Sequence, residues 1–424
     1  MKYKKISEKF FQENRINLVK ELPKGSCAII FANNVISSNA DGENLFKQNS
    51  NFFYLTGIEK PNCILLLVSN YEEKIEDNFF LFIPKVGEHE KIWEGDLLTV
   101  EKSKEISGVS KVFYIENFSD IFRKISKGIN SIFFDANEHP RQATMDYLTI
   151  EEQRINNFKK KFPLHKFCRL APILSKLRSV KKDFEIEMIK KACEITTVAF
   201  RKMLTKVKKC SYEYELEAEI LYEVMKKGCY RMAYTPIIAS GKNALSLHYN
   251  ANHSKYSKED LILLDIGSEY ANYASDITRV IPASGEFSSE QSKIYDAVLS
   301  VLKLSEKIFK VGKTTKVAFE EMTEHLQEKI FQLGLIRYKD SGDYKKYFMH
   351  GMGHHLGLDT HDDVDYNAKL SDGMVFAIEP AIYIENKNIG IRLENNFFLK
   401  NGSLINICSE TPIEREEIES IINN

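Results

Sequence analysis

Four carboxylates in the second half of the sequence stand where an isolated charge would be costly. Asp265 ends the apolar run LILLD, and Asp276 follows eleven residues later in the segment ASDITRV. Glu379 and Glu394 are also embedded in apolar, strand-like sequence. Buried carboxylates are rarely left without a partner. The four positions together predict a site for something cationic, although either Asp taken alone would be better interpreted as a turn cap or a partner of Arg279.

Histidines gather between the two pairs of carboxylates. The segment HGMGHHLGLDTH, from His350 to His361, holds four of the ten histidines within twelve residues. Its glycines do not have the GxGxxG spacing of a phosphate-binding loop and predict tight turns instead. Carboxylates combined with an imidazole suit hard or borderline divalent ions. The sequence therefore predicts two divalent ions, with Mn²⁺ expected and Co²⁺ or Zn²⁺ as alternatives, that share bridging carboxylates and activate a water molecule.

The elements that must position these side chains follow from apolar spacing. Strand-like runs cover residues 261–267, 274–281, 375–385 and 389–399. A turn between the first two would form a hairpin that brings Asp265 and Asp276 onto neighbouring strands. Apolar residues at steps of three or four predict helices over 183–203, with Asp183 as the N-cap, and over 216–224, 294–308 and 319–333. Helices segregated from antiparallel strands predict an α+β domain.

The first part of the chain has a different pattern. Short apolar runs, rich in β-branched and aromatic residues, predict buried strands at 27–31, 63–68, 79–83, 112–115 and 132–134. Longer helical or loop segments separate these runs, which is typical of an α/β domain. We therefore expect two domains, an N-terminal domain at residues 1–174 and a second domain at residues 175–424.

Composition and charge exclude several classes of protein. The chain has 424 residues, of which 43% are hydrophobic and 28% charged, so most of its length is expected to fold. Its 59 basic and 60 acidic side chains leave a net charge of −1, which argues against a nucleic acid as the main partner. No apolar run approaches the ~18 residues of a membrane span. Seven cysteines without a CxxC pair, and no secretory signal, predict a cytoplasmic protein.

At this point the motifs resemble those of a known family. The segments resemble, in order, the metal-ligand motifs of the pita-bread metallopeptidases: Asp265-x-Gly267, Asp276-x-Thr278-Arg279, His354 in its Gly-rich loop, Glu379-Pro380 and GIRLE ending at Glu394. The segment KQNSNFFYLTG at 47–57 resembles the (R/K)Q(N/D)SxFxYLTG signature in the N-terminal domain of aminopeptidase P. The resemblance covers nearly the whole chain. It implies an α/β N-terminal domain followed by an α+β pita-bread (creatinase/aminopeptidase-like) catalytic domain.

The resemblance also implies a role for particular residues. Five residues would ligate the two metals: Asp265, Asp276, His354, Glu379 and Glu394. Asp276 and Glu394 would bridge the ions, and Glu379 would also act as the general base.

Further residues match the substrate side of the family site. His248 and His361 match histidines that stabilise the tetrahedral intermediate. His350 and Arg392 match residues that line the side where proline and the rest of the peptide sit. Trp93 lies in a segment, IWEG, that resembles one reaching an active site in oligomers of some members.

Some positions depart from the family pattern. His355 follows His354 where an aromatic residue is common, and Ala381 follows Glu379-Pro380 where glycine is frequent. Asn395 and Asn396 stand where an acidic pair is usual. No departure removes a ligand, although groups around the ligands alter metal affinity by about 10- to 100-fold.

The function implied by the resemblance is metal-dependent Xaa-Pro aminopeptidase activity, in which activated water cleaves the bond before a proline at the second position of a peptide. A prolidase restricted to Xaa-Pro dipeptides is the alternative with the same chemistry. A non-catalytic binding module on the same fold is the alternative of a different class, and the complete ligand set argues against it. The expected partners are such peptides and further copies of the chain, as a homodimer or homotetramer, with neither nucleic acid nor membrane.

Overall fold

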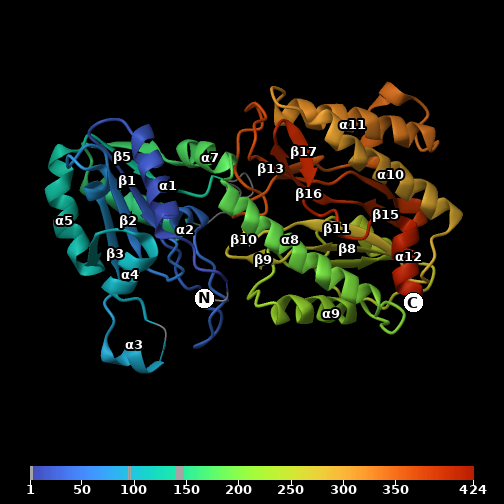
Figure 1. Ribbon diagram of the computed structural model, residues 1–424, viewed down its shortest axis with the longest axis horizontal. Coiled ribbons are helices and arrows are strands. Elements are labelled where there is room, and N and C mark those ends of the chain that lie inside the picture. Colours follow the sequence, from blue (N-terminus) through green and yellow to red (C-terminus); the bar gives the residue numbers. More distant parts are fainter. Residues whose placement is uncertain (1–2, 94, 96, 139–147) are drawn as a thin grey trace. The chain divides into compact units, whose positions relative to one another are not determined.

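The computed structural model describes residues 3–93, 95, 97–138 and 148–424, and the chain divides into two compact units (Figure 1). The N-terminal unit comprises Lys5–Leu177, and the C-terminal unit comprises Arg178–Asn424 together with Tyr3 and Lys4. The division falls inside helix α7 (Ala171–Ser179). Among the described residues, no helix is both long enough and apolar enough to cross a membrane.

The N-terminal unit is built on one mixed sheet. Its strands in the described part of the chain are β1 (Ser26–Phe31), β2 (Ile64–Val68), β3 (Phe79–Ile83), β4 (Lys111–Tyr114), β5 (Ser131–Phe134) and β6 (Lys166–Arg169). They lie in the order β4-β3-β2-β1-β5-β6. The pairs β1–β2 and β2–β3 are antiparallel, and the others are parallel. The five predicted strands are all present, whereas β6 was missed because its half-exposed sequence KFCR has no apolar run.

Helices flank this sheet. They are α1 (Glu8–Glu21), α2 (Ser50–Thr56), α4 (Val100–Ser107), α5 (Phe118–Ile125) and α6 (Ile150–Lys161), whereas α3 (Glu88–Trp93) lies apart from the strands in Figure 1. Phenylalanines of α5 and α6, including Phe122 and Phe158, pack with the strand residues Phe31 and Phe134 on one face. This dense aromatic packing confirms the predicted α/β character of the unit.

The signature segment of the N-terminal unit is held by a single amide. The Gln48 side chain accepts hydrogen bonds from the backbone N–H groups of Asn33 and Asn49, both at 2.9 Å. It donates to the carbonyl oxygens of Ile58 at 3.0 Å and Lys60 at 2.9 Å. The glutamine of the signature therefore ties together the chain before and after α2, which explains why an amide is needed there.

The C-terminal unit contains two main groups of strands. The three-stranded sheet orders β11 (Ile277–Pro282), β8 (Leu261–Ile266) and β7 (Ile237–Ser240), all antiparallel. The four-stranded sheet orders β12 (Gly353–His355), β13 (Val375–Ile378), β16 (Asn395–Lys400) and β17 (Ser403–Asn406). Two ribbons complete the pattern, β9 (Glu269–Tyr270) with β10 (Tyr273–Ala274) and β14 (Ala381–Ile384) with β15 (Ile389–Arg392).

The predicted helices of this unit are all present. They are α8 (Asp183–Leu204), α9 (Glu213–Lys226), α10 (Ser289–Ile308) and α11 (Thr315–Gln332), and α12 (Arg415–Asn423) follows near the C-terminus. Figure 1 shows α10 and α11 along one side of the unit and α8 and α9 along another, with strands between them. One detail was wrong, because the N-cap of α8 is Lys182, and Asp183 is the first helical residue. The backbone N–H of Lys182 donates to the buried Glu185 carboxylate at 3.0 Å.

Two predicted strands are each broken in the middle. The run expected over 375–385 splits into β13 and β14 at Glu379-Pro380, where proline has no N–H to continue the ladder. The run expected over 389–399 splits into β15 and β16 at Leu393-Glu394. The Glu394 N–H instead donates to the carbonyl oxygen of Thr278 in β11, at 3.0 Å. Both glutamates therefore stand at corners where the chain passes from one sheet to another.

Candidate metal centre

Strand register brings the predicted ligands toward one place. In the hairpin of β8 and β11, Asp265 pairs with Thr278, and Asp276 immediately precedes β11. This confirms the predicted hairpin. In the other sheet His354 pairs with Ala377, two residues before Glu379.

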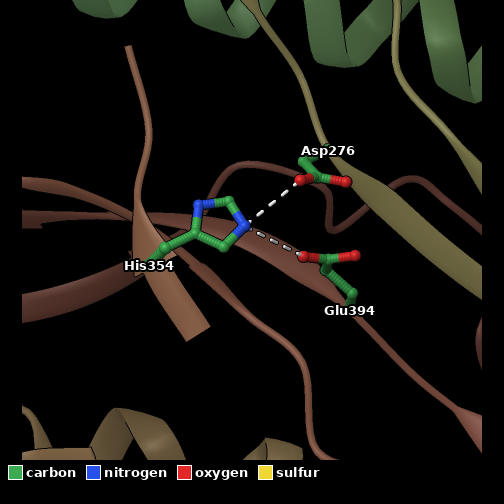
Figure 2. A group of neighbouring side chains, drawn as sticks. All are labelled: Asp276, His354 and Glu394. Atoms are coloured by element: carbon green, nitrogen blue, oxygen red, sulfur yellow. Dashed lines mark ion pairs between the residues drawn. The ribbon is translucent and has the colours of Figure 1, made fainter. Parts of the chain in front are cut away.

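Asp276, His354 and Glu394 form the centre of the cluster (Figure 2). The Nε2 atom of His354 lies 3.3 Å from Oδ2 of Asp276 and 3.9 Å from Oε1 of Glu394. One ligand atom from each residue lies within 4.8 Å of the other two, and all three residues are buried. Three side chains from separate parts of the unit thus point their ligand atoms at a common space.

The tautomer of His354 follows from its other ring nitrogen. Nδ1 lies 3.1 Å from the carbonyl oxygen of His355, which can only accept, so Nδ1 carries the hydrogen and Nε2 of the neutral ring presents a lone pair. That lone pair faces carboxylate oxygens. The buried Oε1 of Glu394 has no hydrogen-bond partner among the described residues. Lone pairs that face one another without a donor are the arrangement that a cation stabilises.

Asp265 is connected to this cluster through a tyrosine. The Tyr234 hydroxyl lies 2.5 Å from Oδ1 of Asp265 and 2.6 Å from Oδ1 of Asp276. A hydroxyl has one hydrogen, so it can donate to only one of the two carboxylates at a time. The other oxygen of Asp265 accepts from the Arg392 guanidinium at 2.6 Å. The two aspartates therefore lie side by side with a single neutral donor between them.

Burial and mutual repulsion disfavour ionisation of the carboxylates. Burial raises the pKa of Asp276 well above its usual value, and the charge of Asp265 adds to the effect. The pKa of Glu394 is raised in the same way by burial and by Asp276. Burial, followed by the charge of Glu394, raises the pKa of Glu379 to about 8. Carboxylates packed this closely need positive charge to ionise together, and oxygen-rich sites of this kind fit divalent cations.

The predicted substrate residues form a hydrogen-bonded chain beside the carboxylates. Nδ1 of His350 donates to the carbonyl oxygen of Gly351 at 2.7 Å, and Nε2 lies 3.0 Å from the Tyr383 hydroxyl. Arg392 donates to the same hydroxyl at 2.9 Å. His350 Nδ1 also lies 3.8 Å from Oε2 of Glu379. Burial, helped by the charge of Arg392, lowers the pKa of His350 to about 4, so its imidazole is neutral near pH 7.

The remaining predicted residues are placed less closely. The His361 ring stacks on the His354 ring, with centroids 3.9 Å apart and planes inclined by 10°. His248 is exposed and follows the short 3₁₀ helix η5 (Gly241–Leu245), near enough to His350 to contribute to its lowered pKa. Trp93 ends α3 in the N-terminal unit with 75% of its surface exposed. Its contribution to a site stays a prediction.

Three residues of the site were missed in the sequence. Tyr234 gave no signal, because it is an isolated tyrosine in a loop before β7. Tyr383 was expected to be a core residue. It is buried, but its hydroxyl also links His350 to Arg392. Thr278, which donates to Glu394 at 2.6 Å, could have been found, because alternation along a strand places it on the same side as Asp276.

The surroundings of His355 explain why a histidine can stand where an aromatic residue is common in the family. Its buried ring packs against Phe376 and Tyr366, with centroids 4.6 and 5.4 Å away, and Nε2 lies 3.1 Å from the Thr315 hydroxyl. Burial lowers the pKa of His355 to about 3. It therefore serves as a neutral ring in an aromatic pocket and does not face the carboxylates as His354 does.

Two family profiles match the sequence. Residues 187–401 match Metallopeptidase family M24, and residues 11–133 match the aminopeptidase P N-terminal domain. The M24 match contains Asp265, Asp276, His354, Glu379 and Glu394, and the other contains the signature at 47–57.

Curated relatives are similar along nearly the whole chain. A Xaa-Pro aminopeptidase of Haemophilus influenzae is 31% identical over 99% of this chain and 98% of its own length. Xaa-Pro aminopeptidase 3 of Dictyostelium discoideum is 33% identical over 99% of this chain and 84% of its own. The mitochondrial intermediate cleaving peptidase 55 of Arabidopsis thaliana is 28% identical over 97% of this chain and 82% of its own length.

Solved structures agree with the sequence matches. A Bacillus anthracis protein described as an aminopeptidase P has a TM-score of 0.93 at 34% identity, and each chain is covered to 99%. Aminopeptidase P of Escherichia coli has a TM-score of 0.89 when zinc-substituted and in complex with product, and 0.87 with the inhibitor Pro-Leu. Both are 28% identical and covered to 99%. These matches confirm the predicted fold, and the chain belongs to the aminopeptidase P family of M24 metallopeptidases.

Proposed function

We propose that this protein is a metal-dependent Xaa-Pro aminopeptidase. Its substrates would be peptides with proline at the second position, and it would release the residue before that proline. The observation that carries the proposal is the buried cluster of Asp276, His354 and Glu394, in which an oriented imidazole lone pair and an unpartnered carboxylate oxygen share one space. Such a cluster is suited to hold cations rather than to stabilise the fold.

The proposed ligands are the five residues that the motifs predict. Asp265, Asp276, His354, Glu379 and Glu394 would hold two divalent cations. Bound cations supply a water molecule that ionises near neutral pH and a Lewis acid for the substrate carbonyl. Mn²⁺ is the proposed native ion, and the oxygen-rich donor set favours it over ions that prefer thiolate.

The proposed chemistry assigns proton movements to the chain itself. A carboxylate oxygen of Glu379 would take the proton of the attacking water and return it to the leaving nitrogen of proline. His248 and His361 would donate hydrogen bonds to the oxyanion that develops on the substrate carbonyl. Their exposed positions at the edge of the cluster support this role, because incoming peptide can reach them.

The other side of the site would bind the peptide beyond the cleaved bond. His350 and Arg392 are joined by the Tyr383 hydroxyl, so their side chains are held in fixed positions before substrate arrives. A bond to proline has no N–H, and recognition must therefore use the ring and the carbonyl groups that follow it. Side chains held in fixed positions beside the carboxylates would line the space for the proline ring and the residues that follow it.

The relatives support the proposal and suggest a second candidate. Two of the named relatives are Xaa-Pro aminopeptidases, and the E. coli structures hold a product and the inhibitor Pro-Leu. The similarity to intermediate cleaving peptidase 55, over 97% of the chain, favours as second candidate a peptidase that cleaves intermediates, as the name of that relative states. The proposal further includes a cytoplasmic location, a homodimer or homotetramer, and Trp93 as a contact to substrate.

A panel of peptides tests the proposal. Purified protein is treated with chelator, restored with Mn²⁺, Co²⁺ or Zn²⁺, and assayed on Xaa-Pro-Yaa, Xaa-Pro and Xaa-Ala-Yaa peptides. We expect cleavage of Xaa-Pro-Yaa that chelator abolishes and metal restores. Cleavage confined to Xaa-Pro would indicate a prolidase, and preference for Xaa-Ala-Yaa would contradict specificity for proline and favour the second candidate. A protein that binds metal but cleaves no peptide would be a binding module.

A further inference from the structure

A cluster of buried charges lies against the loop that carries His361. Asp362 accepts a hydrogen bond from the guanidinium of Arg178 at 2.6 Å and another from the ammonium of Lys181 at 2.8 Å. The side chains of Asp362 and Lys181 are each 1% exposed, and that of Arg178 is 8% exposed. We call Arg178, Lys181 and Asp362 the buried ion cluster. None of the three is among the proposed metal ligands or the residues proposed to contact the peptide.

Stability alone does not explain the buried ion cluster. Three charges taken out of water lose hydration that their mutual attraction only partly offsets. Apolar side chains of similar volume commonly fill such a space equally well or better. Charge-assisted hydrogen bonds, in contrast, are directional and fix the relative positions of the segments that carry them. The cluster is therefore better suited to hold a particular backbone arrangement than to add stability.

The segment that the cluster holds is the loop at residues 356–361. The N–H of Asp359 donates to Oδ1 of Asp362 at 3.2 Å, and the Asp359 carboxylate accepts from Arg178 at 2.7 Å. The N–H of Asp362 donates to the carbonyl oxygen of His355 at 2.9 Å and so closes the loop. The middle and the end of the loop are thus both bound to the cluster.

Gly357 brings the start of the loop directly against the same charges. A Cβ atom on Gly357 would lie 2.5 Å from Oδ2 of Asp362 and 2.9 Å from Cε of Lys181, so no larger residue fits without a shift. The carbonyl oxygen of Gly357 accepts from the N–H of Ala274 at 2.9 Å, two residues before Asp276. The loop therefore lies between the buried ion cluster and the strand that leads to a proposed ligand.

His361 is the last residue of this loop before Asp362. Its ring stacks on the ring of His354, with centroids 3.9 Å apart and planes inclined by 10°. His354 itself belongs to β12 and pairs with Ala377 of β13, so its position is set by the sheet. His361 is exposed, and the direction of its ring therefore depends in large part on the backbone that carries it.

We propose that Arg178, Lys181 and Asp362 are positioning residues for His361. Their hydrogen bonds hold the loop so that the His361 ring lies parallel to the His354 ring, where it can donate to the oxyanion of the substrate. The proposal rests on the proposed function for what His361 does, but the placement of the ring is independent of activity. A shift of about 1 Å in such a group can lower the rate about 100-fold. Loss of the cluster should therefore lower kcat more than it changes KM.

A variant without the three charges separates positioning from stability. Arg178→Met/Lys181→Met/Asp362→Val, the apolar variant, leaves no member of the cluster buried without its partner. We expect it to unfold at a denaturant concentration close to that of wild type and to keep its metal content. Its kcat for Xaa-Pro-Yaa peptides should be about 10- to 100-fold lower, with little change in KM. Lys191→Gln/Glu194→Gln, which removes an exposed ion pair of α8, is the matched control and should match wild type.

Gly357→Ala displaces the same loop without any change of charge. Its methyl group would overlap the cluster, so kcat should fall with little change in KM. Gly128→Ala is the control, because a Cβ atom there meets nothing within 4 Å. In a His361→Ala background, Gly357→Ala and the apolar variant should each lower kcat by no more than about twofold, because residues that act through one another are not additive. Full additional losses in that background overturn the proposal.

Nuclear magnetic resonance measures the ring position without an assay of activity. Stacking on His354 shifts the ring-proton resonances of His361 upfield, and His361→Ala identifies these resonances by their loss. In metal-free protein we expect them to move toward their unfolded-chain positions in the apolar variant and in Gly357→Ala. Unchanged resonances in either variant, once folded, overturn the proposal. If wild type cleaves no peptide, the proposed function fails, and the same spectra still decide whether the cluster positions the ring.

Discussion

Asn396 holds Asp276 by both of its main-chain groups. Its side-chain oxygen accepts from the Asp276 N–H at 2.9 Å, and its side-chain nitrogen donates to the Asp276 carbonyl at 2.6 Å. The amide belongs to β16, two residues beyond Glu394, whereas Asp276 immediately precedes β11. One buried side chain thus fixes the distance between the strand ends that carry two of the proposed ligands.

Replacement of Asn396 by leucine should loosen this connection. Leucine has the same branched shape but leaves two buried backbone groups of Asp276 without partners, and the free energy of unfolding should fall by about 2 to 5 kcal/mol. Metal affinity, measured by calorimetric titration, should fall by about 10- to 100-fold. Asn157→Leu, at an exposed position on α6, is the control and should change neither quantity. Unchanged stability in Asn396→Leu would show that the amide does not hold Asp276 in solution.

Asp362, next to His361, is the centre of a buried ion cluster whose loss should be severe. Its two oxygens accept from Arg178 at 2.6 Å and from Lys181 at 2.8 Å, and the Lys181 side chain is only 1% exposed. Asp362→Asn leaves that ammonium buried without a carboxylate. The free energy of unfolding, measured by denaturant titration, should therefore fall by about 3 to 5 kcal/mol. Asp359→Asn is the matched control, because its carboxylate also binds Arg178 but is 42% exposed. A loss no larger than that of the control would contradict the prediction.

The same cluster predicts how stability changes in acid. Burial alone would raise the pKa of Asp362, but the charges of Lys181 and Arg178 hold it well below its usual value. The unfolded chain therefore binds a proton near pH 4 that the folded chain does not, and stability falls as pH falls below about 4. The contribution is fully present above that pH. Asp362→Asn should show a shallower decline between pH 4 and pH 2 than wild type, measured by thermal unfolding at each pH.

Glu213 fixes the segment that carries His248. One carboxylate oxygen accepts from the Ser240 N–H and hydroxyl, both at 2.7 Å, and from Asn243 at 2.9 Å. The other accepts from the Tyr249 hydroxyl at 2.7 Å and the Ser254 N–H at 2.9 Å. The start of α9 is thereby fastened to residues on both sides of His248.

Glu213→Gln should therefore loosen this loop without removing any proposed catalytic group. An amide nitrogen would face donors that it cannot satisfy, so hydrogen exchange across residues 241–254 should accelerate and stability should fall by about 1.5 to 3 kcal/mol. Peptide hydrolysis should fall because His248 is less well positioned. Glu217→Gln is the control. The Glu217 carboxylate accepts a hydrogen bond from the Asn252 side chain at 3.0 Å, and the amide oxygen of glutamine can accept the same bond. Exchange equal to that of the control would contradict the role given to Glu213.

The ligand positions could be predicted from sequence because a carboxylate in an apolar run is costly. Asp265 and Glu379 were visible for that reason, and the pairing of β8 with β11 followed from a turn between two apolar runs. The corners at Glu379-Pro380 and Leu393-Glu394 were not predicted, because apolar composition is the same on both sides of each break. They depend on contacts with distant strands, such as the bond from Glu394 to Thr278.

Residues that act through long-range hydrogen bonds were also out of reach. Asn396 was visible only as a departure from a family pattern, and its partner lies 120 positions away in the chain. Tyr234 lies in a loop without periodicity and gains its meaning only when two aspartates approach it. Local spacing predicts which face a side chain takes, whereas these contacts require the folded arrangement of separate strands.

Glu379→Gln tests the proposed role of the general base. Glutamine keeps the volume and can accept hydrogen bonds but cannot take a proton, so hydrolysis of Xaa-Pro-Yaa peptides should fall by about 10²- to 10⁴-fold. The metal-free variant should unfold at a denaturant concentration equal to or above that of wild type, because burial disfavours the charged form of Glu379 and an amide is never charged. Glu385→Gln, at an exposed position six residues further along, is the matched control and should retain full activity. Metal content measured on both variants separates a lost base from a lost ion. Near-normal hydrolysis by a folded, metal-loaded Glu379→Gln protein would show that another group takes the proton.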